Sequence, residues 1–234
     1  MRNYIIINGQ SSAEIEGLII ERLAPISKPQ QRTNVITVDG RDGDIITPLG
    51  YSAYDKSITI GLSYNYDVDQ VIEYFNQSGT IIFSNEPDKY YKFAIYEQID
   101  LERLIRFKRA IVTLHVQPFK YSAIETAKTF SFTSGGTATI VNSGNTTSKP
   151  KLVITGTGTV TVNLNGSQIL TINMTSPTIT IDAEAMEAYS QDNTLANRSV
   201  QGNYNSLQLN PRSNTLTFGG DVTNVTITNY SRWI

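Results

Sequence analysis

The stretch Lys151-Leu-Val-Ile-Thr-Gly-Thr-Gly-Thr-Val-Thr-Val-Asn-Leu-Asn-Gly-Ser-Gln-Ile-Leu-Thr-Ile172 alternates apolar and polar residues and is twice interrupted by glycine. Such alternation is typical of strands that bury one face, because successive side chains point to opposite sides of a sheet. Asn165-Gly166 is the strongest two-residue signal for a hairpin turn. Gly156-Thr157-Gly158 also separates two alternating runs, so the stretch predicts three antiparallel strands joined by two turns.

The flanking sequence continues this pattern. Gly135-Gly136 separates two more alternating runs, and Asn210-Pro-Arg-Ser-Asn214 predicts a tight loop before a final hairpin. Further strands are predicted at Thr178–Ile181, Thr215–Phe218 and Val222–Thr228. Many short strands with regular turns are typical of an antiparallel β-sandwich, and no short repeat period is visible.

The composition changes near residue 130. Residues 1–130 contain 14 of the 19 lysines and arginines and 16 of the 21 aspartates and glutamates, whereas residues 131–234 contain five of each. The second part is rich in Ser, Thr and Asn, which is typical of a turn-rich β module. We therefore predict two domains, 1–130 and 131–234, with a boundary between Tyr121 and Phe132 and a connector at residues 122–128.

The first domain is predicted to be rich in strands, with one helix. Residues 57–64 alternate, and residues 109–117 place four apolar side chains on one face, namely Ala110, Val112, Leu114 and Val116. Between these strands, Asp67 is the predicted helix N-cap and Gln70 completes a capping box. Gly79 is predicted to end this helix, because glycine easily adopts a left-handed backbone.

The acidic segment Asp39-Gly-Arg-Asp-Gly-Asp44 contains two Asp-Gly turn dipeptides. It lies between the apolar runs Val35–Val38 and Ile45–Thr47, so it predicts a hairpin. The segment superficially resembles a calcium loop, but it lacks the alternating ligand spacing and the distal glutamate of an EF-hand. A turn is therefore favoured over a calcium site.

No residue pattern indicates catalysis. His115 is the only histidine and there is no cysteine, which excludes multi-histidine metal sites, disulfides and thiolate chemistry. No serine lies in a nucleophile elbow, and no glycine-rich phosphate loop or dinucleotide fingerprint is present. Paired carboxylates could serve a hydrolase, but no local motif indicates a pair. We expect no enzyme activity, catalytic residue, cofactor or metal, and expect His115 to be an ordinary strand residue.

Charge and hydropathy exclude two further classes. A net charge of -2 does not fit a protein that grips nucleic acid, which needs a clustered basic surface. The apolar run Tyr4–Ile7 is too short for a signal peptide, and no run approaches the ~20 apolar residues of a membrane span. We therefore expect no membrane insertion.

Tyrosine is abundant, with 13 residues. Tyr64 and Tyr66 precede the predicted helix, and Tyr90 and Tyr91 flank a predicted hairpin tip. Tyrosine is enriched at protein contacts because it combines an apolar ring with a polar end. For any one of these tyrosines, a solvated strand face is an equally good interpretation.

A further pattern runs along nearly the whole chain. Its segments are Val38–Ile45 with a Gly-Arg-Asp-Gly loop, the helix Val68–Asn76 followed by Gly79–Phe83 and Pro87–Lys92, Ile111–Val116 ending in Gln117–Tyr121, Asn142–Gly158, Leu207–Gly220 and Ser231–Trp233. No single motif is specific, but the ordered set resembles the distal tail protein (Dit) family of siphophages that infect Gram-positive bacteria. Asp39 departs from the family, which often has proline there. The chain resembles a minimal member, without inserted sugar-binding modules or a long arm.

The resemblance implies a mainly β fold: an N-terminal β-sandwich-like domain with one α-helix and a hairpin, then a galectin-like or carbohydrate-module-like antiparallel β-sandwich. It implies a structural protein of the virion, in the phage tail tip or baseplate, synthesised in the host bacterial cytoplasm. The N-terminal domains would form a homo-hexameric ring that joins the tail tube protein to the tail-tip hub (tail-associated) protein. DNA would pass through its channel without specific binding. A receptor-binding protein would be a further partner, and the C-terminal domain would be peripheral.

Six residues are candidates for the ring interface: Arg41, Asp42, Tyr64, Tyr66, Tyr90 and Tyr91. Arg41 is included because a charged fork between two flexible glycines can reach several acceptors. Two other functions stay open, a carbohydrate-binding adhesion module that contacts the host cell wall and a cell-wall hydrolase. The first would need exposed aromatic side chains on a concave sheet, and the second would need a catalytic site.

Overall fold

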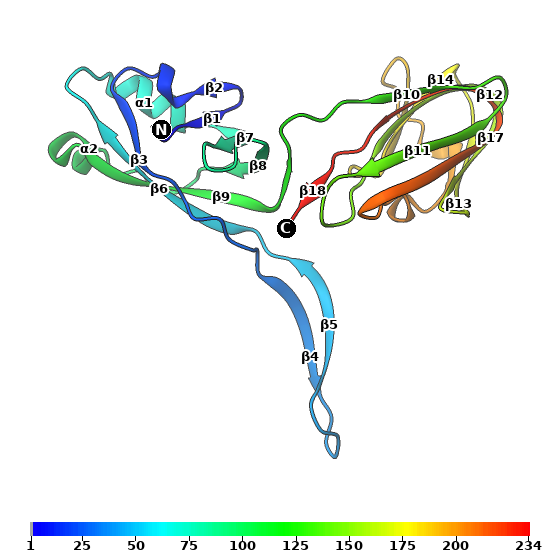
Figure 1. The fold of residues 1–234 in the computed structure, drawn as a ribbon, viewed down its shortest axis with the longest axis horizontal. Helices are drawn as coiled ribbons and strands as arrows, with labels where there is room; N and C mark the ends of the chain where they lie inside the picture. The colour runs from blue at the N-terminus through cyan, green and yellow to red at the C-terminus, as the bar shows by residue number, and fades with distance from the viewer. Residues whose placement is uncertain (1) are drawn as a thin grey trace. The chain divides into compact units, whose positions relative to one another are not determined.

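Long alternating strands dominate both parts of the chain. The computed structural model describes residues 2–234. Contacts among them separate unit 1, which runs to Ala123 and includes Ile234, from unit 2, Ile124–Trp233 (Figure 1). Each unit has its own hydrophobic core.

Unit 1 is built on an antiparallel sheet with the strand order β2-β1-β7-β8-β9-β6-β3. These strands are β1 (Ile5–Ile7), β2 (Gln10–Ser11), β3 (Leu18–Arg22), β6 (Tyr54–Leu62), β7 (Ser78–Phe83), β8 (Lys89–Ala94) and β9 (Arg109–Ser122). The alternation predicted for β9 is confirmed, because Ala110, Val112, Leu114 and Val116 are all buried. His115 lies on the opposite face of the same strand, as an ordinary strand residue.

The first helix, α1 (Val68–Phe75), begins where the sequence predicts, after the Asp67 cap, whose carboxylate accepts hydrogen bonds from two backbone amides of the first turn. It packs its apolar side on the core of unit 1. Gly79 does not end it, and that prediction is wrong. The helix ends at Asn76, and Gly79 lies in β7 with φ +138, where the Asn8 side chain occupies the space that a Cβ would need.

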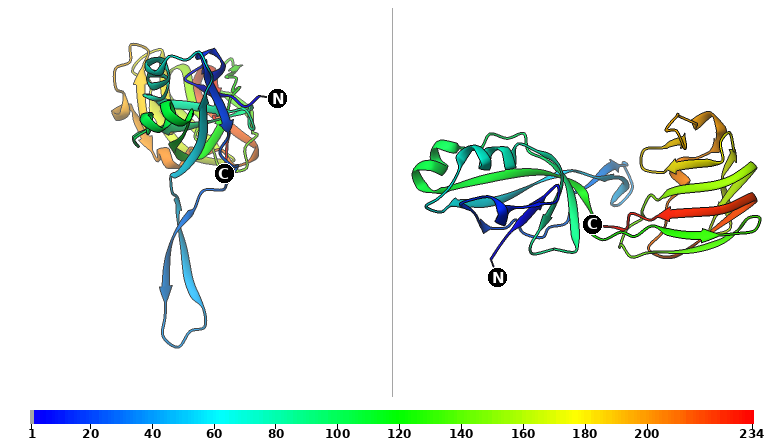
Figure 2. Two further views of the ribbon diagram at one scale, coloured as in Figure 1. Left: turned by 90° about the vertical axis from the view of Figure 1, so that its left-hand side faces the viewer. Right: turned by 90° about the horizontal axis from the view of Figure 1, so that it is seen from above.

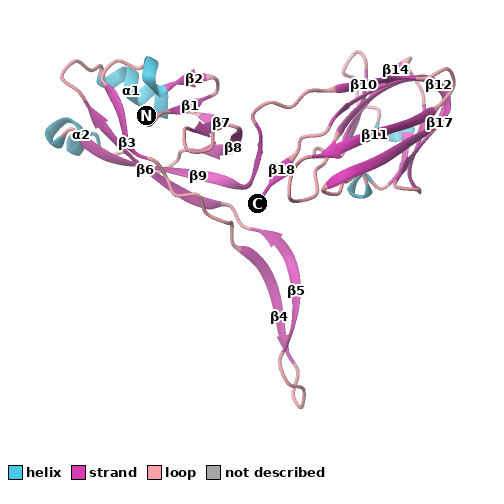
Figure 3. Ribbon diagram, in the orientation of Figure 1, coloured by secondary structure: helices cyan, strands magenta, loops and turns pink. Residues whose placement is uncertain are grey.

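A second helix, α2 (Leu101–Phe107), corrects the prediction of one helix (Figure 3). The Asp100 side chain caps it by accepting a hydrogen bond from the Arg103 amide at 2.8 Å. Leu104 is buried against the sheet, and Lys108, with a left-handed backbone (φ 56), ends the helix. Two turns with one buried leucine are too short to show a helical period in the sequence. Short 3-10 helices are η1 (Ser12–Glu14), η2 (Asn197–Ser199) and η3 (Tyr204–Ser206).

A long hairpin leaves the sheet between β3 and β6. Its strands, β4 (Gln31–Thr37) and β5 (Asp44–Tyr51), pair only with each other, and both are exposed along almost their whole length (Figure 1). The turn lies at the predicted glycines, Gly40 and Gly43, which both have positive φ. We call residues 31–51 the arm. The hairpin predicted at these residues is therefore confirmed, and it is longer and more exposed than the sequence indicated, since alternation looks the same in a strand inside a sheet and in a free hairpin.

Unit 2 is a curled antiparallel sheet around a single core, and the predicted β-sandwich is confirmed. Its strands are β10 (Lys128–Ser131), β11 (Gly136–Asn142), β12 (Lys151–Leu164), β13 (Ser167–Asn173), β14 (Thr178–Asp182), β15 (Glu187–Ser190), β16 (Val200–Gly202) and β17 (Arg212–Thr228). The last strand of the chain, β18 (Arg232–Trp233), is not part of this sheet. The predicted turn between β12 and β13 is present, and Asn165 (φ 50) and Gly166 (φ 86) both have positive φ.

The two longest strands of unit 2 belong to both layers of the sandwich. The first half of β12 pairs with β14 and its second half with β13, while β17 runs beside it throughout. Figure 2 shows the strands of this unit from two further sides. On the other edge of β17, β10 and β11 pair one after the other. The predicted turns at Gly156–Gly158 and Gly135–Gly136 are therefore wrong, as is the predicted final hairpin in residues 215–228. These glycines bend or interrupt strands that continue in the same direction.

Glycine makes these bends sterically feasible. The pairing of β12 with β17 shifts register beside Gly156 and again between Thr157 and Thr161. A Cβ on Gly156 would lie 2.5 Å from the Asp221 carbonyl oxygen, and one on Gly220 would lie 2.3 Å from the Thr159 carbonyl oxygen. Bulges and glycine kinks of this kind turn a strand without reversing it, so one sheet can form both layers.

We predict that Gly220→Ala destabilises unit 2 more than Gly158→Ala. Both glycines have positive φ, +87 and +70, so alanine costs about 1–2 kcal/mol at either position. A Cβ at Gly158 meets nothing within 4 Å, whereas at Gly220 it meets backbone and adds about 1–3 kcal/mol of overpacking. Urea unfolding of the two variants measures the difference. Equal losses would show that the bend does not depend on close backbone approach.

Candidate assembly surfaces

The arm exposes apolar side chains on both of its faces. The cross-strand pair Val35 and Ile46 lies on one face, and the pair Ile36 and Ile45 lies on the other. All four side chains are exposed, as is Leu49 nearer the base. A two-stranded hairpin alone is at best marginally stable in water, so both faces of the arm are suited to contact with another molecule.

The tip of the arm carries two of the predicted interface residues. Arg41 and Asp42 lie between Gly40 and Gly43, and both side chains are exposed. The Asp44 carboxylate accepts a hydrogen bond from the Thr37 hydroxyl at 2.9 Å across the end of the hairpin. The structure thus places Arg41 and Asp42 where they could contact a neighbouring molecule, and not in the core of their own chain.

The segment that leads into the arm is tied to unit 1 through its backbone carbonyl groups. The Lys56 ammonium donates to the Pro25 carbonyl at 2.7 Å, and the Asn85 amide donates to the Ala24 carbonyl at 3.2 Å. The Lys56 ammonium also lies 5.1 Å from the centre of the Tyr91 ring. These contacts fix the base of an otherwise exposed hairpin.

A buried charge network lies under this anchor. Glu86 accepts hydrogen bonds from the Lys120 ammonium and the Tyr91 hydroxyl, each at 2.6 Å. Burial lowers the pKa of Lys56, an effect that the Glu86 carboxylate opposes. Burial also raises the pKa of Tyr91, and the hydrogen bond to Glu86 raises it further. Buried charges are tolerated only when paired, so this network has a structural role in unit 1.

Tyr91 is consequently a core residue, and its choice as an interface candidate is wrong. Its ring is fully buried and packs edge-on against Phe83. Neighbouring residues of a strand face opposite sides, so Tyr90 lies on the other face of β8, where its ring stacks on Tyr121. Tyr90 is half-buried.

The other two tyrosines lie at the opposite end of the sheet, near α2. Tyr64 is fully exposed in the loop after β6. Tyr66 accepts a hydrogen bond from the Lys108 ammonium at 2.7 Å, and that ammonium also lies 4.0 Å from the Tyr66 ring centre. Of the six candidates, the structure therefore brings Arg41 and Asp42 together at the arm tip, and it places Tyr64 and Tyr66 near one another in a single loop.

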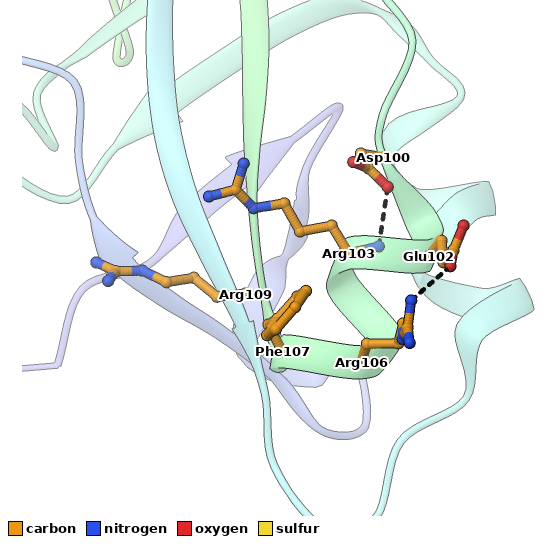
Figure 4. Close-up of a pocket in the computed structure, with 6 residues that line it drawn as sticks. All are labelled: Asp100, Glu102, Arg103, Arg106, Phe107 and Arg109. Carbon is orange, nitrogen blue, oxygen red and sulfur yellow. Dashed lines mark hydrogen bonds and ion pairs between the residues drawn. The ribbon is translucent and has the colours of Figure 1, made fainter.

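The α2 region holds exposed residues that the sequence reasoning did not select. Arg103, Arg106, Phe107 and Arg109 line an open depression of ≈ 470 Å³ together with Asp100 and Glu102 (Figure 4). Arg106 pairs with Glu102 at 3.0 Å, and Figure 4 shows Arg103 and Arg109 extending to the same side of the helix. The sequence signal was three arginines and a phenylalanine within seven residues, a composition favoured at interface hot spots.

The described residues offer little for other functions. Residues 2–234 contain no group of three or more acidic, histidine or cysteine side chains that could hold a metal ion, and no helix among them is long and apolar enough to cross a membrane. His115 bonds to Asp55 at 2.7 Å on a strand face. In the described part of unit 2, the strongly exposed large apolar side chains are Ile124, Val141, Met186 and Leu195, none of them aromatic.

Two solved structures are similar over almost the whole chain. SPP1 Dit, described as a paradigm of the hub adsorption apparatus in phages that infect Gram-positive bacteria, matches with a TM-score of 0.70 and 14% identity over 100% of both chains. This chain has the Dit fold. A chain of the phage P2 baseplate in its activated conformation with Ca matches with a TM-score of 0.57 and 9% identity, over 98% of this chain and 97% of that one. No family model and no curated protein sequence matches.

The match to the Dit fold includes both units and leaves no large insertion in either chain. The predicted resemblance is thus confirmed at the level of the fold. At 14% identity the shared property is the backbone arrangement, so the roles of individual side chains must be argued from this chain's own contacts.

We predict that Glu86→Ala lowers the stability of unit 1 by about 3–5 kcal/mol, because it leaves the Lys120 ammonium buried without its partner. Tyr91→Phe removes one hydrogen bond and keeps the ring, so it should cost about 1 kcal/mol. Hydrogen exchange of amides in β8 and β9 reports on unit 1 separately. Similar small losses for both variants would show that the charge pair is not structural.

Proposed function

We propose that this chain is a structural subunit of a phage tail tip or baseplate, with no enzymatic role. The observation that carries the proposal is the full-length match to SPP1 Dit, which covers 100% of both chains. The second match, to a phage P2 baseplate chain, points to the same kind of assembly. Among residues 2–234, the exposed arm and the basic α2 region are suited to assembly. No arrangement of side chains in this part of the chain indicates a catalytic site.

The finer proposal is a homo-hexameric ring made by unit 1. Six copies of 25.9 kDa give a particle of about 155 kDa. A ring requires two different surfaces on each subunit that fit each other, repeated until the assembly closes. The arm is one such surface, because its two apolar faces are exposed in the single chain and need a partner.

In this proposal the ring joins the tail tube protein to the tail-tip hub protein and encloses a channel for DNA. A receptor-binding protein attaches at its periphery. Unit 2 is a peripheral module, since it has its own core and only twelve charged residues. Sugar binding by unit 2 is disfavoured, because sugar-binding surfaces need exposed aromatic rings and the described part of unit 2 presents none that is strongly exposed.

Ile46→Asp tests the ring. Ile46 is 63% exposed, so the change should alter monomer stability by less than about 0.5 kcal/mol, yet it places a charge on an apolar face of the arm. We expect light scattering and electron microscopy to show loss of the hexamer. Leu195→Asp is the matched control in unit 2, with 65% exposure, and should assemble normally.

Both variants are measured with the tube and hub proteins present, because a ring can need its partners to persist. A wild-type dimer or tetramer that stays stable under these conditions would contradict the hexamer. Rings formed equally well by Ile46→Asp would show that the arm is not part of the interface.

A further inference from the structure

One edge of the unit 2 sheet ends in β11, which pairs with β17 on one side only. Its seven residues, Gly136-Thr-Ala-Thr-Ile-Val-Asn142, keep one continuous register with β17, without a bulge. No strand within residues 2–234 pairs with the other edge of β11. β11 is therefore an edge strand, and an edge strand leaves alternate backbone N–H and C=O groups without a partner strand.

The hydrogen bonds of β17 show which backbone groups of β11 point outward. The Asn165 amide donates to the Thr215 carbonyl, and the Thr215 amide donates to the Asn165 side chain, so the backbone of Thr215 faces β12. Its cross-strand partner Thr139 therefore points its own amide and carbonyl away from β17, as do Thr137 and Val141 on either side. We call these outward groups of residues 137–141 the free edge.

One end of the free edge is closed by unit 2 itself. The Asn229 side-chain amide donates to the Val141 carbonyl at 3.0 Å, and the Ser143 amide donates to the Ser231 hydroxyl oxygen at 3.3 Å. The other outward backbone groups of the free edge have no hydrogen bond within residues 2–234. An added strand can therefore pair with residues 137–141 and must end there.

Edge strands are usually protected against strand addition by shortness, charge, proline or a bulge. β2, β10, β15, β16 and β18 have four residues or fewer, and β3 has Glu21, Arg22 and a bulge. In the arm, β4 has Arg32 and a bulge, and β5 has Asp44 and Pro48. β11 has none of these features, and the three residues with outward backbone groups are all β-branched, which favours an extended strand.

We propose that the free edge of β11 binds an extended segment of another protein, which joins the sheet of unit 2 as a further strand. The occupant is a polypeptide, because outward N–H and C=O groups that recur at every second residue match the repeat of another extended backbone. The segment is uncharged, since β11 offers no charge to pair with and its inward side chains, Ala138 and Ile140, belong to the apolar core.

A second copy of β11 does not fit the free edge. In a symmetric antiparallel pair centred on Thr139, the Val141 carbonyl of one copy faces the Thr137 amide of the other. Asn229 already donates to that carbonyl, and the second copy would continue past it into the space held by the 229–231 segment. A segment of a different protein can end before this point, so the free edge favours a heterologous partner. The inference does not depend on the proposed tail-tip function.

Amide hydrogen exchange of the full-length chain, followed by NMR, tests whether the edge is free. The amides of Ala138 and Ile140 face β17 and should be protected. Those of Thr137 and Thr139 should exchange at least about 100-fold faster, because they face solvent. Equal protection of all four amides in the chain alone would show that the edge is covered and would overturn the inference.

The binding probe is a fluorescent, acetylated and amidated peptide with the sequence of residues 213–219. This segment is uncharged and is the part of β17 that pairs with the inner edge of β11. We expect saturable binding to the full-length wild type by fluorescence anisotropy. Thr139→Pro should weaken binding at least about tenfold, about 1.4 kcal/mol, because proline removes an outward N–H but none that bonds to β17.

Two further variants complete the test. Thr129→Pro is the matched control, an exposed threonine in the edge strand β10, and should bind the probe within about twofold of the wild type. Thr139→Lys keeps the amide and adds a charge of the kind that protects edge strands, so it should also weaken binding, at least about threefold. Circular dichroism of each variant shows whether unit 2 has kept its fold.

Three results would contradict the inference. The first is a wild type that shows no saturable binding of the probe, and the second is equal binding by the wild type and a folded Thr139→Pro or Thr139→Lys variant. The third is a dimer of the full-length chain that Thr139→Pro dissociates, which would assign the free edge to a second copy. None of these results bears on the proposed ring, which is tested separately by the assembly of Ile46→Asp.

Discussion

The bending of two long strands at glycine is the constraint on which unit 2 depends. β12 and β17 together supply the centre of both layers, so each of the strands β10, β11, β13, β14, β15 and β16 is placed by pairing with one of them or with a neighbour of theirs. The backbones approach so closely at Gly156 and Gly220 that a side chain at either position would meet a carbonyl oxygen. Because one sheet forms both layers, its two halves can enclose a single core without a disulfide.

Unit 1 meets a different constraint, which is to hold an exposed hairpin in place. The arm contributes nothing to the core of its own unit, so its direction depends on the contacts at its base. Lys56 supplies one of these contacts, and it lies beside the Tyr91 ring and the Glu86 carboxylate. A buried ion pair is weak evidence for stability but can specify one arrangement over others. Here the network joins the base of the arm to β9 through Lys120.

The sequence predicted features that depend on neighbouring residues. The Asp67 cap, the Asn165-Gly166 turn and the buried face of β9 all follow from local chemistry or a period of two. Gly156–Gly158 was misread because glycine permits both a reversal and a bend, and the partner strand decides between them. Tyr91 and Tyr64 could not be told apart, since burial depends on how the strands pair. The α2 surface was missed because two turns carry too weak a periodic signal.

The elements of unit 1 that the sequence predicted incompletely are also the elements that expose side chains suited to assembly. The local pattern missed α2, and it predicted the hairpin of the arm but not its exposure; both elements present side chains that their own chain does not bury. Elements stabilised mainly by their own core show clear periodicity, because burial selects the apolar face. An element that completes its packing against another copy carries a weaker or two-sided pattern, as the arm does with apolar pairs on both faces. In the proposed ring, each such surface would contact the next subunit, and the exposed arm of the single chain would become an internal element of the assembly.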